Sequence, residues 1–269
     1  MQTTDPFPSI AAVGEGIGRI SERHWDRFVR LMLRGPMADR DERFVRLVTG
    51  APHPFANLAV VCKPDDLEST KAAMQTLRTC GAPAALNYTG RVPTPVHEYL
   101  VGQGFEPHAP LVAMAVDIDR LADTSLPEGY SYVRIGPGPE CATWASCFAT
   151  GFGFPPILGD VFSPAVLGPN PTAGAPAQFF AIVKDGRPVC TTMLYLENGV
   201  AGIYCVATVP EERGKGLGAH AASEPLRLAR KLGYRVGILQ ATEVGHPIYL
   251  RLGYQDVGEV PVYVRMPGP

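Results

Sequence analysis

The sequence predicts an α/β protein of the α+β type, with mixed, mostly antiparallel sheets flanked by helices. Two turn pairs carry this prediction, because Asp185-Gly186 and Asn198-Gly199 each separate apolar runs in the way that tight hairpin turns do. A helix-like run at 219–232 follows directly, so hairpins and helices belong to one domain. The three strands expected around the turns are 178–184, 188–197 and 200–209.

A series of elements in the second half of the chain recurs in the first half. Strand, helix, strand, short helix and strand are expected over 203–265, and the same series fits 55–117 at an offset of about 150 residues. In each copy an aromatic residue, Phe105 or Tyr254, follows the glycine that closes the short helix. We interpret this as an internal pseudo-repeat; the alternative is a chance recurrence, since such an order is common in α/β proteins.

The repeat divides the chain into two predicted domains, 1–120 and 130–269, with a polar linker at 121–129. Before the first copy we expect a loosely held lead-in over 1–20, and then a helix capped by Ser21 that ends at Gly35-Pro36. The run 41–48 fits a helix or a strand. The other strands expected are 57–62, 84–88, 111–117, 130–135, 236–241 and 260–265, and the other helices are 67–80, 95–102, 140–150, 160–167 and 247–252.

Composition excludes several classes of protein. The 269 residues are 46% hydrophobic, which is ample for a core, and the net charge of −2 predicts no non-specific binding to nucleic acid or to an anionic membrane. No apolar run approaches the roughly 20 residues of a membrane helix, and the first residues do not form a signal peptide. None of the six cysteines lies in a Cys-x-x-Cys pair, so we expect reduced thiols, a cytoplasmic location and no metal site.

The stretch from Thr208 to Gly218 is the most informative in the chain. A strand-like run precedes it, a helix-like run follows it, and glycine occupies positions 214, 216 and 218. Glycine lets the backbone approach a ligand and adopts positive φ, and the first N–H groups of a helix attract anions. We therefore predict a phosphate cradle here.

Two familiar phosphate loops do not fit this stretch. A Walker loop requires Ser or Thr after its lysine, and none follows Lys215. A dinucleotide fingerprint requires Gly-x-Gly-x-x-Gly after the first strand of a parallel βαβ unit, whereas this loop has the wrong last spacing and leaves an antiparallel meander.

Arg213, Gly216 and Gly218 fill the pattern Arg/Gln-x-x-Gly-x-Gly/Ala, which resembles the acyl-CoA loop of the GNAT N-acetyltransferase family. The resemblance covers about 130–265 and includes Thr208-x-Pro210. It implies acetyl-CoA as co-substrate. In the first repeat, 63–68 stands where the loop should be, without glycine and with added negative charge, so we predict tandem GNAT-like domains of which the first has lost its cofactor site.

The resemblance also assigns roles to residues. The backbone N–H groups from Gly214 to Gly218 should hold the diphosphate, with the side chains of Arg213 and Lys215 beside it. The pantetheine arm should lie in a splay between 204–209 and 236–241. The residues that contact the cofactor are then Ala207, Thr208, Val209, Arg213, Gly214, Lys215, Gly216, Leu217 and Gly218.

Tyr249 lies in a segment that looks like the family's closing short helix, and is expected to protonate the departing thiolate. Its alternative role is to pack its ring on the sheet. The base is open, because the strand 202–208 holds no acid where many relatives have one. Glu197 could act through water or be a solvated turn residue, and Glu243 and His246 could line the acceptor side. We do not expect Cys205 to carry the acyl group.

The leading interpretation is an acyltransferase that moves an acetyl group from acetyl-CoA to a small amine, as a monomer or homodimer. A non-catalytic acyl-CoA-binding or regulatory module is the alternative, because the usual base is missing. A small-molecule kinase is disfavoured by the loop. The acceptor is not readable from the residues.

Overall fold

The structure is a computed structural model that describes residues 8–34, 37–167 and 175–267. The chain forms two compact units. The first contains Ala113–Val257 together with the residues up to Ser21, and we call it the glycine-loop unit. The second contains Glu22–Val112 together with the residues from Gly258 onward, and we call it the companion unit.

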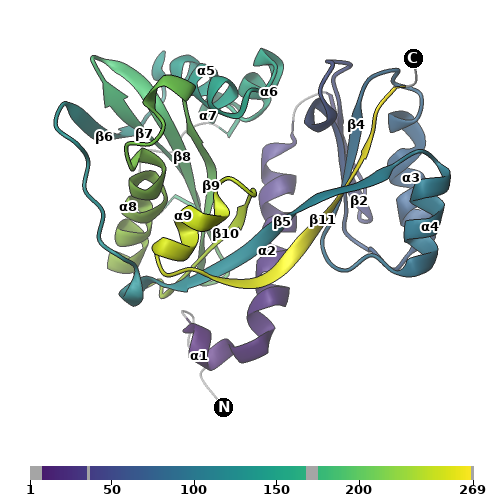
Figure 1. The fold of residues 1–269 in the computed structure, drawn as a ribbon, viewed down its shortest axis with the longest axis horizontal. Coiled ribbons are helices and arrows are strands. Elements are labelled where there is room, and N and C mark those ends of the chain that lie inside the picture. The colour runs from purple at the N-terminus through teal and green to yellow at the C-terminus, as the bar shows by residue number, and fades with distance from the viewer. Residues whose placement is uncertain (1–7, 35–36, 168–174, 268–269) are drawn as a thin grey trace. The chain divides into compact units, whose positions relative to one another are not determined.

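A mixed sheet with the strand order β5-β10-β9-β8-β7-β6 forms the centre of the glycine-loop unit (Figure 1). Strands β6 to β9 form the predicted antiparallel meander, and β10 runs parallel to β9. Both predicted turn pairs have positive φ at each residue, as a tight hairpin turn requires. The strands are β5 (Glu106–Asp117), β6 (Tyr130–Ile135), β7 (Ala177–Lys184), β8 (Arg187–Glu197), β9 (Val200–Thr208) and β10 (Val236–Ala241).

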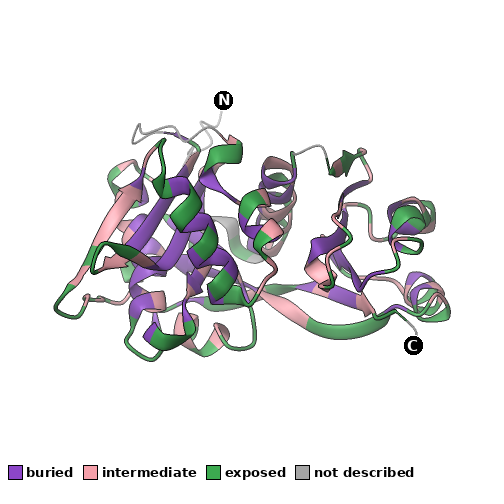
Figure 2. Ribbon diagram, turned by 90° about the horizontal axis from the view of Figure 1, so that it is seen from above, coloured by how far each residue is buried: buried purple, intermediate pink, exposed green. Residues whose placement is uncertain are grey.

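Helices cover both faces of this sheet. Phe179 and Phe180 are neighbours in β7, so their side chains point to opposite faces. Trp144 meets Phe179 with ring centroids 5.2 Å apart, whereas Tyr132 stacks on Phe180 and also meets His220. The helices that carry Trp144 and His220 therefore lie on opposite faces, with buried strands between them (Figure 2). The helices are α1 (Ile10–Val13), the start of α2 (Ile17–Met32), α5 (Glu140–Phe152), α6 (Pro156–Val161), α7 (Pro164–Leu167), α8 (Leu217–Lys231) and α9 (His246–Arg251).

The companion unit has the strand order β1-β2-β3-β4-β11. β3 and β4 are parallel, while β2 and β11 run antiparallel to their neighbours. Its core packs Met74, Leu77 and Leu100 of two helices against buried strand residues such as Tyr88. The elements are β1 (Ala38–Arg40), β2 (Phe44–Val48), β3 (Asn57–Val61), β4 (Ala84–Tyr88), β11 (Gln255–Arg265), α3 (Leu67–Leu77) and α4 (Thr94–Gly102).

The two units repeat one series of elements. β3-α3-β4-α4 and β9-α8-β10-α9 have the same order, and in both series the two strands pair in parallel. β5 follows the first series in the chain but lies beside β10 of the second series in the sheet. β11 follows the second series in the chain but lies beside β4 of the first series. The mixed α+β architecture is confirmed; superposition of 55–117 on 203–265 remains a prediction.

This exchange of strands shapes the units. The predicted domains 1–120 and 130–269 are consecutive, whereas the compact units are discontinuous, because 113–117 joins the glycine-loop unit and 258–265 joins the companion unit. The physical reason is that an unpaired strand edge needs a partner: β11 pairs with β4 over four residues. Division into two functional domains around the linker 121–129 remains a proposal.

Two predictions for the first 50 residues are wrong. The described part of the lead-in, 8–20, is not loose, because α1 begins at Ile10 and Ile17 is buried in a core cluster. Ser21 is not a helix cap: it lies inside α2, is fully buried and accepts a hydrogen bond from Gln240 at 3.2 Å. The run 41–48 contains a strand, and the predicted stop at 35–36 falls outside the described residues. No helix in the described ranges combines the length and apolar character needed to span a membrane.

Candidate functional site

The parallel pair β9 and β10 opens into a splay. Only two positions pair, Ala201 with Gly237 and Gly202 with Ile238, although β9 continues to Thr208. Backbone groups of β9 that point toward β10 beyond Gly202 therefore lack a ladder partner there. The gap is the place where the resemblance puts the pantetheine arm.

A bulge in β9 accompanies the splay. Cys205 has φ 55°, a left-handed conformation that is rare for a residue with a side chain. The register with β8 shifts between Thr191 and Met193, so that Cys205 and Val206 together oppose one residue. Thr191 Oγ1 donates to the Cys205 carbonyl at 2.8 Å and holds the bulge. Burial raises the pKa of the Cys205 thiol far above its usual range, which agrees with the expectation that it carries no acyl group.

The glycine turn leads into an uncapped helix. Gly214 and Gly216 have φ 77° and 79°, and Gly216 is the N-cap of α8 without a side-chain capping bond. A Cβ at either position meets no atom within 4 Å, so conformation and not crowding selects glycine here. Among the described residues, no protein group accepts the backbone N–H of Gly214, Lys215 or Gly216. This start of α8 presents free N–H groups and the positive end of the helix dipole.

Arg213 is anchored to the protein. Its Nε donates to the Thr208 carbonyl at 3.2 Å, and its Nη2 donates to the Gly151 carbonyl at 2.8 Å. Gly151 is the penultimate residue of α5, and a Cβ there would lie 2.8 Å from the Ala207 Cβ. Arg213 therefore joins the end of β9 to the end of α5.

Lys215 is held in a network around the buried carboxylate of Glu212. Lys215 Nζ lies 2.6 Å from one Glu212 oxygen and Lys184 Nζ lies 2.9 Å from the other, while the Tyr130 hydroxyl donates to the same group. These bonds, from Lys215 first, lower the pKa of Glu212 to about 2. The carboxylate fixes the 3-10 turn at Pro210–Glu212 in front of the glycines. Sequence reasoning missed Glu212, although its spacing of three from Lys215 was visible.

The three residues expected to contact pantetheine, Ala207 and Thr208 at the end of β9 and Val209 after it, already use some of their backbone groups within the protein. The N–H of Val209 donates to Val189 at 3.0 Å and the carbonyl of Thr208 accepts from Arg213. Ala207 and Thr208 pair with β8 on their other side. Contacts to a cofactor can thus come only from the remaining backbone groups of these residues.

Tyr249 is half-buried on α9. A Cβ at Gly245 would lie 3.0 Å from its ring, so this glycine gives the ring its room. Burial, with a smaller contribution from the Cys190 thiol, raises the pKa of Tyr249 far above its usual range. Cys190 accepts from Thr208 Oγ1 at 3.2 Å. Tyr249 is thereby within electrostatic range of the end of β9, and it is protonated at neutral pH.

The candidate bases lie in different places. Glu197 pairs with Val200 at the start of β9, roughly 26 Å along the strand from Thr208. Glu243 is exposed in the loop before α9. His246 is 2.8 Å from the carboxylate of Asp256, and the pair ties the start of α9 to β11. His246 precedes Tyr249 by three residues on α9, and its side chain is engaged with Asp256.

Aromatic residues at and beyond the end of α5 pack on one another, and we call this group the cover. Phe148 contacts Phe152, Phe154 and Phe162, and Phe152 stacks on Phe154 at 5.0 Å. The predicted helix 160–167 is two short helices, α6 and α7, and 168–174 falls outside the described residues. This cover packs on its own aromatic core and adjoins Gly151 beside the loop.

The cysteines and the possible metal ligands form neither a disulfide nor a metal site in the described ranges. Cys141, Cys147 and Cys190 are buried, and Cys62, Cys80 and Cys205 are half-buried; all six are unpaired. No group of three or more His, Cys, Asp or Glu residues there is arranged to hold a metal ion.

The splayed parallel pair, the glycine turn and the uncapped helix are the features that the resemblance to the GNAT family implied, and the comparisons with known proteins point to the same family. Residues 154–254 match the model of the Acetyltransferase (GNAT) family. The match covers β7 to β9 of the meander, the glycine loop and Tyr249. None of the curated proteins matches the chain. The GNAT fold supports acyl transfer from an acyl-CoA.

Solved structures extend the likeness of fold to nearly the whole chain. A GCN5-related N-acetyltransferase from Kribbella flavida has a TM-score of 0.61 at 21% identity, over 93% of this chain and 96% of that one. One from Sphaerobacter thermophilus has a TM-score of 0.59 at 16% identity, over 84% and 78%. A tandem GNAT protein from the clavulanic acid biosynthesis pathway has a TM-score of 0.54 at 17% identity, over 91% and 88%.

Proposed function

We propose that the protein is an acetyl-CoA-dependent N-acetyltransferase whose acceptor is a small amine. The observation that carries this proposal is the joint between β9 and α8, where an open strand edge, two positive-φ glycines and an uncapped helix start stand together. A diphosphate matches the free N–H groups of this joint in charge and geometry. The match of 154–254 to the GNAT family supports the same reaction.

Backbone groups do most of the cofactor binding. The N–H groups of Gly214 to Gly218 hold the diphosphate, and the open edge of β9 at Ala207, Thr208 and Val209 guides the pantetheine arm along the splay. Arg213 and Lys215 act by holding the loop in shape, since both side chains already bind protein groups. The positive charge of Lys215 is partly cancelled by Glu212.

Tyr249 completes the transfer. The lone pair of the amine attacks the thioester carbonyl, the C–S bond breaks, and Tyr249 gives its proton to the sulfur. Its raised pKa keeps that proton in place at neutral pH. The amine must arrive neutral or lose its proton through water, because β9 from Gly202 to Thr208 holds no acid.

A specific observation favours the second candidate, a non-catalytic acyl-CoA-binding module. Glu197 lies at the far end of β9 from the glycine loop, and His246 is engaged with Asp256, so neither is a free base for the amine. The cytoplasmic location, the small-molecule partner and the monomeric or homodimeric state belong to the first proposal.

The experiment is an acceptor screen by thiol release. Acetyl-CoA is mixed with the purified protein and a panel of small amines, and free CoA is titrated with a thiol reagent. The proposal expects turnover with at least one amine, and a fall of about 10²-fold or more in kcat for Tyr249→Phe with the KM for acetyl-CoA unchanged. Tight binding of acetyl-CoA without turnover on any amine would favour the second candidate.

A further inference from the structure

Tyr254 carries a buried hydroxyl that no protein group satisfies. The residue is 3% exposed, and its phenol oxygen has no hydrogen-bond partner among the described residues. Leaving a buried hydroxyl unpaired is unfavourable, so such groups are rare and call for an explanation. Phenylalanine would fill the same space without that cost.

Tyr249 is the aromatic neighbour of Tyr254. Their ring centroids are 5.8 Å apart at 58°, and the Tyr254 N–H donates to the Tyr249 carbonyl at 3.0 Å. Burial raises the pKa of Tyr254 well above its usual range, and the neighbouring Tyr249 raises it further. The two phenols therefore lie within electrostatic range of each other, on one segment that turns from α9 into β11.

The proton transfer proposed for Tyr249 requires a group that stabilises the Tyr249 phenolate. When Tyr249 gives a proton to the CoA sulfur it becomes a phenolate, and burial makes that anion costly. The nearby Cys190 thiol is itself held protonated by burial and bonds with Thr208. A second phenol with an unused O–H is the group that can stabilise the anion.

We propose that Tyr254 is a positioning residue for the transfer, whose hydroxyl donates a hydrogen bond to the Tyr249 oxygen as Tyr249 gives up its proton. The inference rests on the proposed function. The sulfur keeps the electron pair of the broken C–S bond and receives the Tyr249 proton. The Tyr249 phenolate, held by Tyr254, then takes the proton that the acylated nitrogen releases. Tyr254 itself stays protonated throughout.

The first test needs no acceptor and no acetyl-CoA. A fluorinated tyrosine, which ionises at lower pH than tyrosine, is placed at position 249 of the full chain and titrated by ¹⁹F NMR. Tyr254→Phe should raise the apparent pKa of the label by about 1–2, the effect of losing one hydrogen bond to a charged group. Tyr132→Phe is the matched control, because its hydroxyl is also buried without a partner but no interaction connects it to Tyr249. An unchanged titration in Tyr254→Phe would overturn the proposal.

The second test uses turnover with an amine found in the screen. Tyr254→Phe should lower kcat about 10- to 100-fold with the KM for acetyl-CoA unchanged, and should cost nothing further in a Tyr249→Phe background. Equal losses in both backgrounds would show a merely structural role and overturn the proposal. Thermal melting of Tyr254→Phe should show no fall, since the variant removes an unpaired group. If the wild-type chain does not bind acetyl-CoA, the proposed function fails while the ¹⁹F titration still decides whether the two phenols pair.

Discussion

The two units contain the same joint, a strand that turns into a helix, in two chemical states. In the glycine-loop unit, β9 reaches α8 through two positive-φ glycines and an uncapped N-terminus. In the companion unit, β3 reaches α3 through Lys63-Pro64-Asp65-Asp66, and Asp66 is a side-chain N-cap. The neighbouring parallel pair differs too, because β3 and β4 pair at four positions from Leu58 to Val61 whereas β9 and β10 pair at two.

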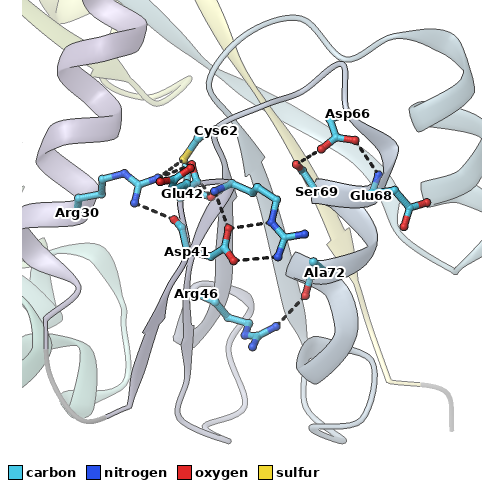
Figure 3. Close-up of polar contacts among 11 residues, drawn as sticks. Arg30, Asp41, Glu42, Arg46, Cys62, Asp66, Glu68, Ser69 and Ala72 are labelled. Carbon is cyan, nitrogen blue, oxygen red and sulfur yellow. Dashed lines mark hydrogen bonds and ion pairs between the residues drawn. The ribbon is translucent and has the colours of Figure 1, made fainter.

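The companion joint satisfies itself. One Asp66 oxygen accepts the Glu68 N–H at 3.1 Å and the other accepts the Ser69 hydroxyl (Figure 3). These bonds, from Ser69 first, lower the pKa of Asp66, so it is charged at neutral pH. The carboxylate occupies the position where an anionic ligand of α3 would bind, and it repels such a ligand.

The difference shows that an anion site of this kind depends on backbone groups that the protein leaves without an internal hydrogen-bond partner. α8 has no side-chain cap, and β9 has no strand partner beyond Gly202, so hydrogen bonds are missing at both places. In the proposed function, a bound diphosphate and pantetheine supply those hydrogen bonds and thereby stabilise the protein. In the companion unit the Asp66 cap and the pairing of β3 with β4 already satisfy the corresponding backbone groups of α3 and β3. The prediction that the first repeat has lost its site agrees with this contrast.

The largest expected effect comes from giving α8 the cap that α3 has. Gly216→Asp places a carboxylate at the N-cap, where it accepts the free N–H groups and repels the diphosphate. Acetyl-CoA affinity should fall at least about 100-fold, or roughly 2.7 kcal/mol, in a calorimetric titration. Gly216→Asn is the matched control, since it has the same size and tolerates positive φ but lacks the charge. Equal affinity for the two variants would mean that charge plays no part in the contrast.

A smaller effect is expected from separating α5 from β9. Gly151→Ala puts a Cβ 2.8 Å from Ala207 Cβ and 3.1 Å from the Thr208 nitrogen, so the helix must move and the Arg213 anchor must lengthen. Overpacking of this kind costs about 1–3 kcal/mol of unfolding free energy. Chemical denaturation measures it, with Gly102→Ala as control, because that helix residue of the companion unit has open space around it. A loss no greater than in the control would contradict the close approach.

Glu212 makes stability depend on pH. Its folded pKa of about 2 lies below the ordinary value of 4.5, so its stabilisation is present above pH 4.5 and is lost as the pH falls toward 2. Glu212→Gln should lower the Tm at pH 7 and flatten the fall in Tm between pH 5 and about 3. Glu211→Gln, at the exposed neighbouring position, should keep the wild-type slope. Identical slopes for Glu212→Gln and wild type would show that the network contributes nothing.

The smallest effect is expected from removing the cap of α3. Asp66→Ala should lower the Tm by a few degrees, because the first turn loses its acceptor. It should not create a second acetyl-CoA site, since β3 and β4 remain paired to their ends. A new binding event in calorimetry would show that the cap alone closes the companion site.

Local chemistry made much of this fold predictable. Asp185-Gly186 and Asn198-Gly199 fixed the meander, because few sequences adopt positive φ twice in succession. The glycines of the loop located the start of α8, and α8 itself begins two residues before the predicted 219. Asp66 with Ser69 three residues later was a readable helix start as well, although only its charge was considered.

What could not be predicted depends on contacts distant in sequence. β11 pairs with β4 across more than 170 residues, and nothing local to either strand selects that partner. Arg213 was expected beside the phosphates, but its anchor on Gly151 lies 62 residues away. The positive φ of Cys205 follows from the register shift against β8, which an apolar strand pattern does not show. The unpaired hydroxyl of Tyr254 is visible only once its surroundings are known.

The stoichiometry of acetyl-CoA binding tests the contrast between the two joints most directly. Isothermal titration of the full chain should give one acetyl-CoA per chain, and Gly216→Asp should remove that binding. Two molecules per chain would show that the companion joint also binds the cofactor, and none would show that the joint between β9 and α8 is not a diphosphate site.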